Sequence, residues 1–452
     1  MNFASIYVST LALLGAVSAG ASPPPLSAQQ IAAKRSGKSV RWERDEAARP
    51  RAHQMVVALL ARPLTANSAA QIALLQNRSI QAAFEEVGIS QADLLEAGRL
   101  TNPIIEGMAR FPNRPADLAG SVAADVLELF LLPLRKRLAE AKLRQTSLRV
   151  ADEALKLVAE TKEAFYEAQA REQILDEMKL SREASDSALD LSQRQREAGN
   201  ISELDLASQQ AADTQSKLEY TLAEADLREK RDRLNRLMGV WGRDADWKAS
   251  DKLPPLPAAA LPAKGLEPLA LEQRLDLQAA KADLESVVQS LGLTKKYRYL
   301  GSFDLGVSGE RDSDGNIRTG PTFQFALPIF NQGQGKIARG EAQLRQAEDR
   351  LEALAADIRS EVRERRDHVA AMHDLAATYH DRLIPERDQI LQLTLLHYNA
   401  MAVGAYGLIQ ARQNEIAAQR GYTEALRDYW IARAELERAV GGSFQTDSNN
   451  KH

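Results

Sequence analysis

The longest stretch without a helix-breaking residue limits most strongly what this chain can fold into. Between Leu138 and Ala198 there is neither glycine nor proline, and at 1.5 Å per residue a helix of that length would measure roughly 90 Å. Inside it, apolar residues recur at the three- and four-residue spacing of a coiled-coil seam: Leu148, Ala151, Leu155, Val158 and Phe165. Such a helix exposes its apolar stripe unless other helices pack beside it. With 44% hydrophobic, 27% charged and only 5% aromatic residues, the composition also favours long helices over compact globular domains.

The second half of the chain repeats the first. At an offset of 202 residues, Leu206 falls on Leu408 and Gly239 falls on Gly441. The seam recurs at Leu344, Ala347, Leu351, Leu354 and Ile358, and then steps four residues to Val362. A step of this kind locally unwinds a supercoil, as helices packed side by side into a wide cylinder require. The sequence therefore predicts two copies of one structural plan.

Each copy is expected to hold a strand hairpin followed by a long helical hairpin, which gives a mostly α chain with a small β part. The expected segments are an export signal at 1–21, an N-terminal extension at 22–63, a first repeat at 64–252, a proline-rich linker at 253–265, a second repeat at 266–442 and a polar tail at 443–452. The strand hairpins are expected at about 104–132 and 299–330, and the helical hairpins at about 138–239 and 336–440.

Targeting and charge narrow the class of protein. The first 21 residues carry no charged side chain and run through an apolar stretch into small residues, as an export signal does, although an ordinary apolar helix has the same pattern. No later uncharged run is long enough for a membrane-spanning helix, so a bilayer could be crossed only by strands. There is no cysteine for disulfides or lipid attachment. The 58 basic and 62 acidic residues form no block of like charge, which argues against a nucleic-acid partner.

The strand segments of the second repeat alternate in polarity, as strands do between lipid and water. Four apolar residues on one face are expected to contact lipid: Phe303, Leu305, Phe323 and Phe325. Asp304, on the other face, is a candidate for the water-filled interior, and an exposed edge charge is the alternative. In the first repeat the matching segments, 104–111 and 122–132, alternate poorly because acidic and basic residues interrupt them. Four strands can scarcely close a barrel, so membrane crossing would require several copies of the chain.

This order of hairpins, twice over, resembles the TolC family of outer-membrane efflux proteins from about Leu64 onward. The segment 319–333, a strand ending in Leu-Pro-Ile-Phe before a long helix, is similar to the most recognisable stretch of the family, and 198–206 and 398–411 resemble its two helical tips. The resemblance implies a homotrimer whose twelve strands form a β-barrel in outer-membrane lipid, continued by an α-helical periplasmic tunnel. It also implies a periplasmic adaptor protein and an inner-membrane export pump as partners. The second tip and the run 422–441 are closest to the branch that accompanies heavy-metal exporters.

The resemblance further implies two kinds of site. The adaptor would contact the tips at Gly199, Asn200, Ile201, Ser202, Val403 and Gly404. Related channels narrow through acidic residues on the helix after the second tip, but here Gly407 and Gln410 occupy those positions. If the alignment slips, Asp205 or Glu415 would supply the acidic ring. Asp205 has an equally simple alternative role, because an acidic residue in the first turn stabilises a helix.

Other functions find little support in the sequence. The histidines at 368, 373, 380 and 397 are not three or four residues apart, so ordinary surface or packing roles are expected and no metal site is assigned. No catalytic triad, phosphate-binding loop or cofactor motif is present, which makes an enzyme the least supported class. The alternative to a channel is a periplasmic adaptor or structural coiled coil, but an adaptor would show one helical hairpin and this chain shows two.

Overall fold

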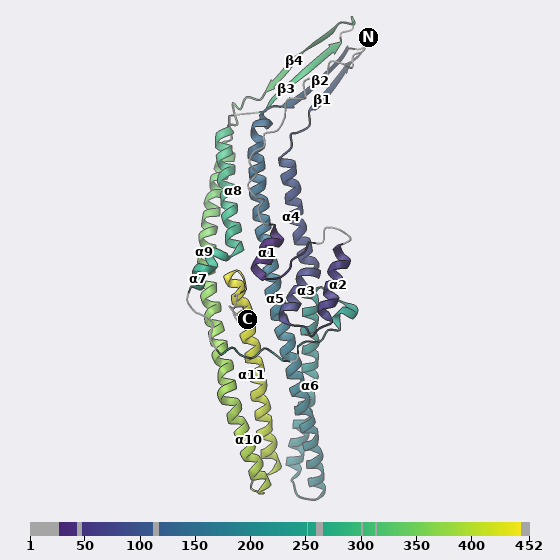
Figure 1. Cartoon of the computed structure of the whole chain (residues 1–452), viewed down its shortest axis with the longest axis vertical. Coiled ribbons are helices and arrows are strands. Elements are labelled where there is room, and N and C mark those ends of the chain that lie inside the picture. The colour runs from purple at the N-terminus through teal and green to yellow at the C-terminus, as the bar shows by residue number, and fades with distance from the viewer. Residues whose placement is uncertain are drawn as a thin grey trace, which may run out of the picture.

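The computed structural model describes residues 27–42, 48–111, 117–250, 252–258, 265–299, 302–311 and 314–443. The expected export signal, the turn at 112–115, part of the linker and the tail after Ser443 lie outside this range. The described chain forms a long rod (Figure 1). A sheet lies at one end, two helical tips lie together at the other, and short helices surround the middle.

The first repeat contains the longest helix. Its elements are α3 (Ala66–Gln76), α4 (Arg78–Ala97), β1 (Ile104–Arg110), β2 (Asp117–Asp125), α5 (Leu127–Glu197) and α6 (Glu203–Met238), preceded by α1 (Ala28–Ser36) and α2 (Ala48–Leu60). Helix α5 has 71 residues, and its expected seam is buried from Leu148 to Phe165. It packs against α3, α4, α6, α8 and α11. The prediction of a long helix that requires neighbours is confirmed.

The second repeat follows the same order with one irregularity. After η1 (Gly242–Ala245), its elements are α7 (Leu266–Gln273), α8 (Leu275–Tyr297), β3 (Phe303–Arg311), β4 (Ile317–Phe325), α9 (Gln334–Thr378), η2 (Tyr379–Leu383), α10 (Ile384–Asn399) and α11 (Ala405–Val440). Both residues of the four-residue step, Ile358 and Val362, are buried. Segment η2 is a π-helical turn, which widens the helix where the α11 backbone at Gly421 lies against the ring of Tyr379.

The second strand of the first repeat lies earlier in the chain than the expected segment 122–132. Strand β2 spans Asp117–Asp125, and 127–132 belongs to α5 rather than to a strand. The Asp125 carboxylate accepts the Leu127 N–H at 2.8 Å, which ends the strand and satisfies a free donor of the first helical turn. The poor alternation of 122–132 followed from including helical residues.

The four strands form one antiparallel sheet in the order β1-β2-β3-β4. Ile105 pairs with Val122, Val122 with Val307, and Val307 with Pro321. Because successive side chains point to opposite faces, these residues lie on one face and Glu106 lies on the other. Both hairpins thus place apolar residues on this face, whereas Ile104 and Met108 of β1 lie with Glu106 on the other.

Within the described ranges, no helix combines the length and the apolar character that crossing a membrane would require.

Candidate functional site: the helical tips and the exposed sheet

The first tip is a five-residue turn, 198–202, stabilised by a capping box. Gly199 has a φ of 74°, a left-handed conformation that suits glycine. The Asn200 N–H donates to the Gln195 carbonyl at 2.8 Å. The Ser202 hydroxyl donates to the Asp205 carboxylate at 2.7 Å and accepts the Asp205 N–H at 3.1 Å. The Ser202 N–H also donates to the Asp205 carboxylate, at 3.1 Å, and the two hydrogen bonds that this carboxylate accepts from Ser202 lower the pKa of Asp205.

The second tip repeats this backbone without the cap. The Ala402 N–H donates to the His397 carbonyl at 2.8 Å, the counterpart of the Asn200 bond at the same 202-residue offset. Met401, the counterpart of Gly199, has a φ of 59° and is 94% exposed. Gly404 and Gly407 replace Ser202 and Asp205, so no side chain caps α11. A non-glycine residue in the left-handed region and the missing cap make this the less stable tip.

The candidates for the pore constriction have different surroundings. Gln410 is exposed and donates to Asn414 at 3.3 Å, and half-buried Gly407 lies one turn before it beside Val403. Asp205 is exposed but belongs to the cap of α6. Glu415 is buried against Arg412 and Gln419 of its own helix. On α11 the Gln410 side chain is therefore more accessible than the Glu415 carboxylate, which is already hydrogen-bonded within its own helix.

A shallow apolar groove lies just above the tips. It runs between α5 and α11 and is lined by Ser181, Ala184, Ser185, Leu408, Ile409, Arg412, Gln413 and Ile416. The Ser185 hydroxyl is buried there and has no hydrogen-bond partner among the described residues. The groove therefore joins the two helical hairpins of one protomer at the end where the expected adaptor contacts lie.

At the opposite end, the apolar sheet face is exposed. Phe323 is 76% exposed and Leu305 is 50% exposed, while Phe303 and Phe325 pack edge to face beside them. Asp304 is half-buried on the other face, where it pairs in register with Asp125 of β2 and Gln324 of β4. The structure thus groups the four expected lipid contacts and separates them from Asp304.

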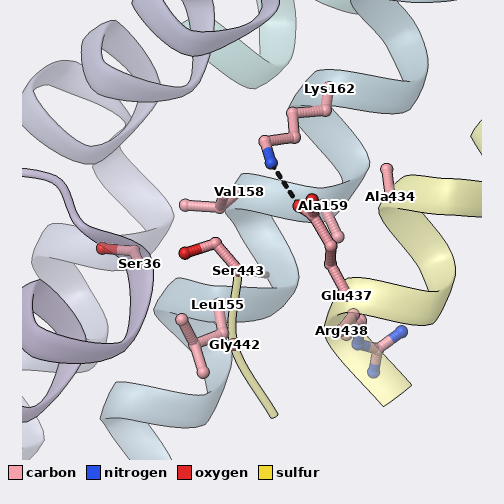
Figure 2. Close-up of a pocket in the computed structure, with 10 residues that line it drawn as sticks. All are labelled: Ser36, Leu155, Val158, Ala159, Lys162, Ala434, Glu437, Arg438, Gly442 and Ser443. Atoms are coloured by element: carbon pink, nitrogen blue, oxygen red, sulfur yellow. Dashed lines mark hydrogen bonds and ion pairs between the residues drawn. The ribbon is translucent and has the colours of Figure 1, made fainter. Parts of the chain in front are cut away.

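The N-terminal extension packs against the middle of the rod, where α1 contacts α5. The sequence did not predict this packing. Ser36 of α1 lies beside α5 and the end of α11, where the Lys162 ammonium lies 2.6 Å from the Glu437 carboxylate (Figure 2). The Ser443 N–H donates to the Arg35 carbonyl at 3.3 Å. Lys38 donates to the Asn67 carbonyl and side chain, and burial together with nearby Lys162 lowers its pKa to about 8. The Arg35–Ser443 contact joins residues about 400 positions apart, and Lys162 and Glu437 are 275 positions apart, so no local pattern in the sequence predicts them.

The histidines take separate places. His373 approaches the Pro257 carbonyl of the linker at 3.0 Å and packs against the ring of Tyr429. His380 lies in η2 beside Asp381. His368 and His397 are exposed. Among the described residues, no group of three or more histidine or acidic side chains is placed to hold a metal ion.

The chain is similar to one metal-resistance protein in sequence and to several outer membrane channels in fold. No family model matches the chain. It is 22% identical over 395 residues to the cobalt-zinc-cadmium resistance protein CzcC of Cupriavidus metallidurans, covering 84% of this chain and 90% of CzcC. In structure it is similar to the CmeC outer membrane channel of Campylobacter jejuni, with a TM-score of 0.71, 15% identity, and coverage of 83% of this chain and 85% of CmeC.

A second structural relative is the open state of the MtrE outer membrane channel of Neisseria gonorrhoeae, with a TM-score of 0.68 and 17% identity. That match covers 83% of this chain and 88% of MtrE. The duplicated hairpins, the sheet and the tips occur in the order that the sequence resemblance implied. The chain therefore shares the fold of these outer membrane channels and resembles the TolC-like family in the order of its elements.

Proposed function

We propose that this protein is the outer-membrane channel of a tripartite efflux system, a passive duct from the periplasm to the exterior that carries out no covalent chemistry. The observation that carries the proposal is the division of the rod: an exposed apolar sheet face lies at one end and two duplicated tips lie at the other. Lipid is the solvent that an exposed apolar sheet face requires, while the tips, at the far end of the rod, would lie in the periplasm. The adaptor alternative requires one helical hairpin, and this chain has two.

The functional unit in this proposal is a trimer. Within the part of the chain that the structure describes, the sheet ends at two edge strands, β1 and β4, whose backbone groups could not remain unpaired in lipid. Three copies would join β4 of one chain to β1 of the next and close twelve strands, with Asp304 toward the lumen. The tips would meet a periplasmic adaptor through Gly199–Ser202 and Val403–Gly404, and an inner-membrane pump would deliver the substrate.

Heavy-metal cations are the substrate class that we favour, because CzcC is named as a cobalt-zinc-cadmium resistance protein and its similarity spans most of both chains. The duct itself would not select them, since the pump to which it docks determines specificity.

Cross-linking in native membranes tests the assembly. Cysteines at Glu106 of β1 and Gln324 of β4 lie on the polar faces of opposite edge strands. A short bifunctional thiol reagent should therefore link copies up to trimers. The control pair, Lys179→Cys with Lys281→Cys, lies on exposed helical surfaces. It should give no series of cross-linked dimers and trimers. A limit at dimers or monomers, or a protein extracted in soluble form without detergent, would contradict the proposal.

A further inference from the structure

The junction between the sheet and the helices carries an exposed apolar band that does not belong to the strands. Its members come from the start of α5, the segment after α8 and the segment after β4: Leu129, Phe130, Tyr299, Leu327, Ile329 and Phe330. Phe330 is 95% exposed and Phe130 is 67% exposed. Both lie outside the coiled-coil seams, so helix packing within the protomer does not account for them.

At each of these places a basic band lies next to the apolar band, on the side away from the sheet. Residues 127–137, 295–299 and 327–339 contain eight lysines and arginines and one acidic residue, Glu128, which is paired with Arg135 at 3.2 Å. The other seven are exposed: Lys136, Arg137, Lys295, Lys296, Arg298, Lys336 and Arg339. Lys295 pairs with Glu341 below the band. Among the described residues, Lys136, Arg137, Lys336 and Arg339 form no ion pair.

The order of the two bands follows distance from the sheet and not chain direction. Helices α5 and α9 run away from the sheet, whereas α8 runs toward it (Figure 1). In all three the apolar residue is nearer the sheet and the basic residues are farther, as with Phe130 and Lys136 on α5. These two residues are six positions apart on the helix, which is about 9 Å along its axis. The polar layer on one side of a bilayer is of similar thickness, roughly 5–8 Å.

Strand length supplies an independent reason for the apolar band. The strands have 7 to 9 residues. At about 3.3 Å per residue and a tilt of about 40°, they span on the order of 18–23 Å of bilayer thickness. The outward-facing apolar band of an outer-membrane barrel is about 25 Å tall. Apolar side chains just beyond the strand ends would complete the contact with lipid.

We infer that these two bands form a lipid-binding collar, in which the apolar band contacts acyl chains and the basic band binds the phosphate groups of anionic phospholipids in the periplasmic leaflet. The inference rests on the proposed membrane channel and adds a ligand class and its residues. Each lysine or arginine close to an anionic membrane surface strengthens binding about fivefold, so the collar favours anionic over zwitterionic lipid.

Tryptophan quenching locates the apolar band. Phe330→Trp is compared with Phe323→Trp on the sheet face and Leu218→Trp, an exposed residue of α6, in vesicles containing brominated phosphatidylcholine. The native tryptophans at 42, 241, 247 and 430 lie outside the sheet and the collar and give a constant background. Quenching at both 323 and 330, but not at 218, is expected. Quenching at 323 alone would overturn the collar and leave the channel standing. No quenching at 323 would remove the channel and the collar together.

Spin-labelled lipids test the basic band. In phosphatidylcholine vesicles, the association of spin-labelled phosphatidylglycerol relative to spin-labelled phosphatidylcholine should fall at least about threefold in a variant with Lys136→Gln, Arg137→Gln, Lys336→Gln and Arg339→Gln. The matched control replaces four exposed cations elsewhere on the helices, Lys179, Lys281, Arg350 and Arg359, by Gln, and should change nothing. Equal loss in both variants, or no preference in the wild type, would overturn the assignment. Displacement by inorganic phosphate at constant ionic strength would instead identify a soluble phosphate site and would also overturn it.

Discussion

Gly306 is the position where the sheet tolerates a side chain least. A methyl group added there would lie 3.0 Å from both Cα and Cβ of Ala123 and still closer to the Val122 carbonyl oxygen. These are mostly backbone atoms of β2, which cannot rotate away as the end of a flexible side chain can. Gly306→Ala should therefore force β2 and β3 apart in the middle of their paired region.

The size of the effect follows from two costs. Overpacking costs about 1–3 kcal/mol, and each ladder hydrogen bond weakened by the displacement adds about 1 kcal/mol. We expect the free energy of folding to become less favourable by about 3 kcal/mol, which is a factor of roughly 150 in the folded population. Urea titration of folding into lipid vesicles, read from the gel mobility of the folded and unfolded forms, measures this quantity.

Two glycines of the same sheet are matched controls. At Gly309 the nearest atom to an added methyl group is the Thr319 Cγ2 at 3.6 Å, and at Gly320 nothing lies within 4 Å. Alanine at either position should change the free energy of folding by no more than about 1 kcal/mol. If Gly306→Ala folded as well as Gly309→Ala, the β2–β3 register described above would be wrong.

Three further outcomes are expected. Block of the isolated channel by trivalent cations should be weak and should strengthen in Gln410→Asp, because three carboxylates near an axis attract such ions more than amides do; potent block that disappears in Asp205→Asn would place the constriction on α6 instead. Replacing Gly199 or Gly404 by Trp should abolish export while trimers still form, and unchanged export in both variants would exclude the tips as the adaptor contact. Because the pKa of Lys38 is lowered from 10.5 to about 8, the unfolded chain binds more protons there between these values, so the free energy of unfolding should rise with pH across this window; urea unfolding of Lys38→Met should lack this rise.

The sequence by itself determined the repeated helical hairpins and the position of their tips. Uninterrupted seams, glycines at the breaks and the 202-residue offset are properties of neighbouring residues along the chain. A helix and its turns respond mainly to such neighbours. For the same reason, strict alternation located the apolar face of β3 and β4 correctly.

The tertiary structure decided the features that depend on residues far apart. Strand β2 is defined by its pairing with β3, about 185 positions away, so its limits were misjudged from local alternation alone. The π-helical turn at Tyr379 is matched to Gly421 on another helix.

The contact of Arg35 with Ser443, and the collar assembled from three separate segments, likewise had no signal in the sequence. Periodicity reports which face of an element is apolar. It does not report which distant element will cover that face, because that choice depends on packing throughout the folded molecule.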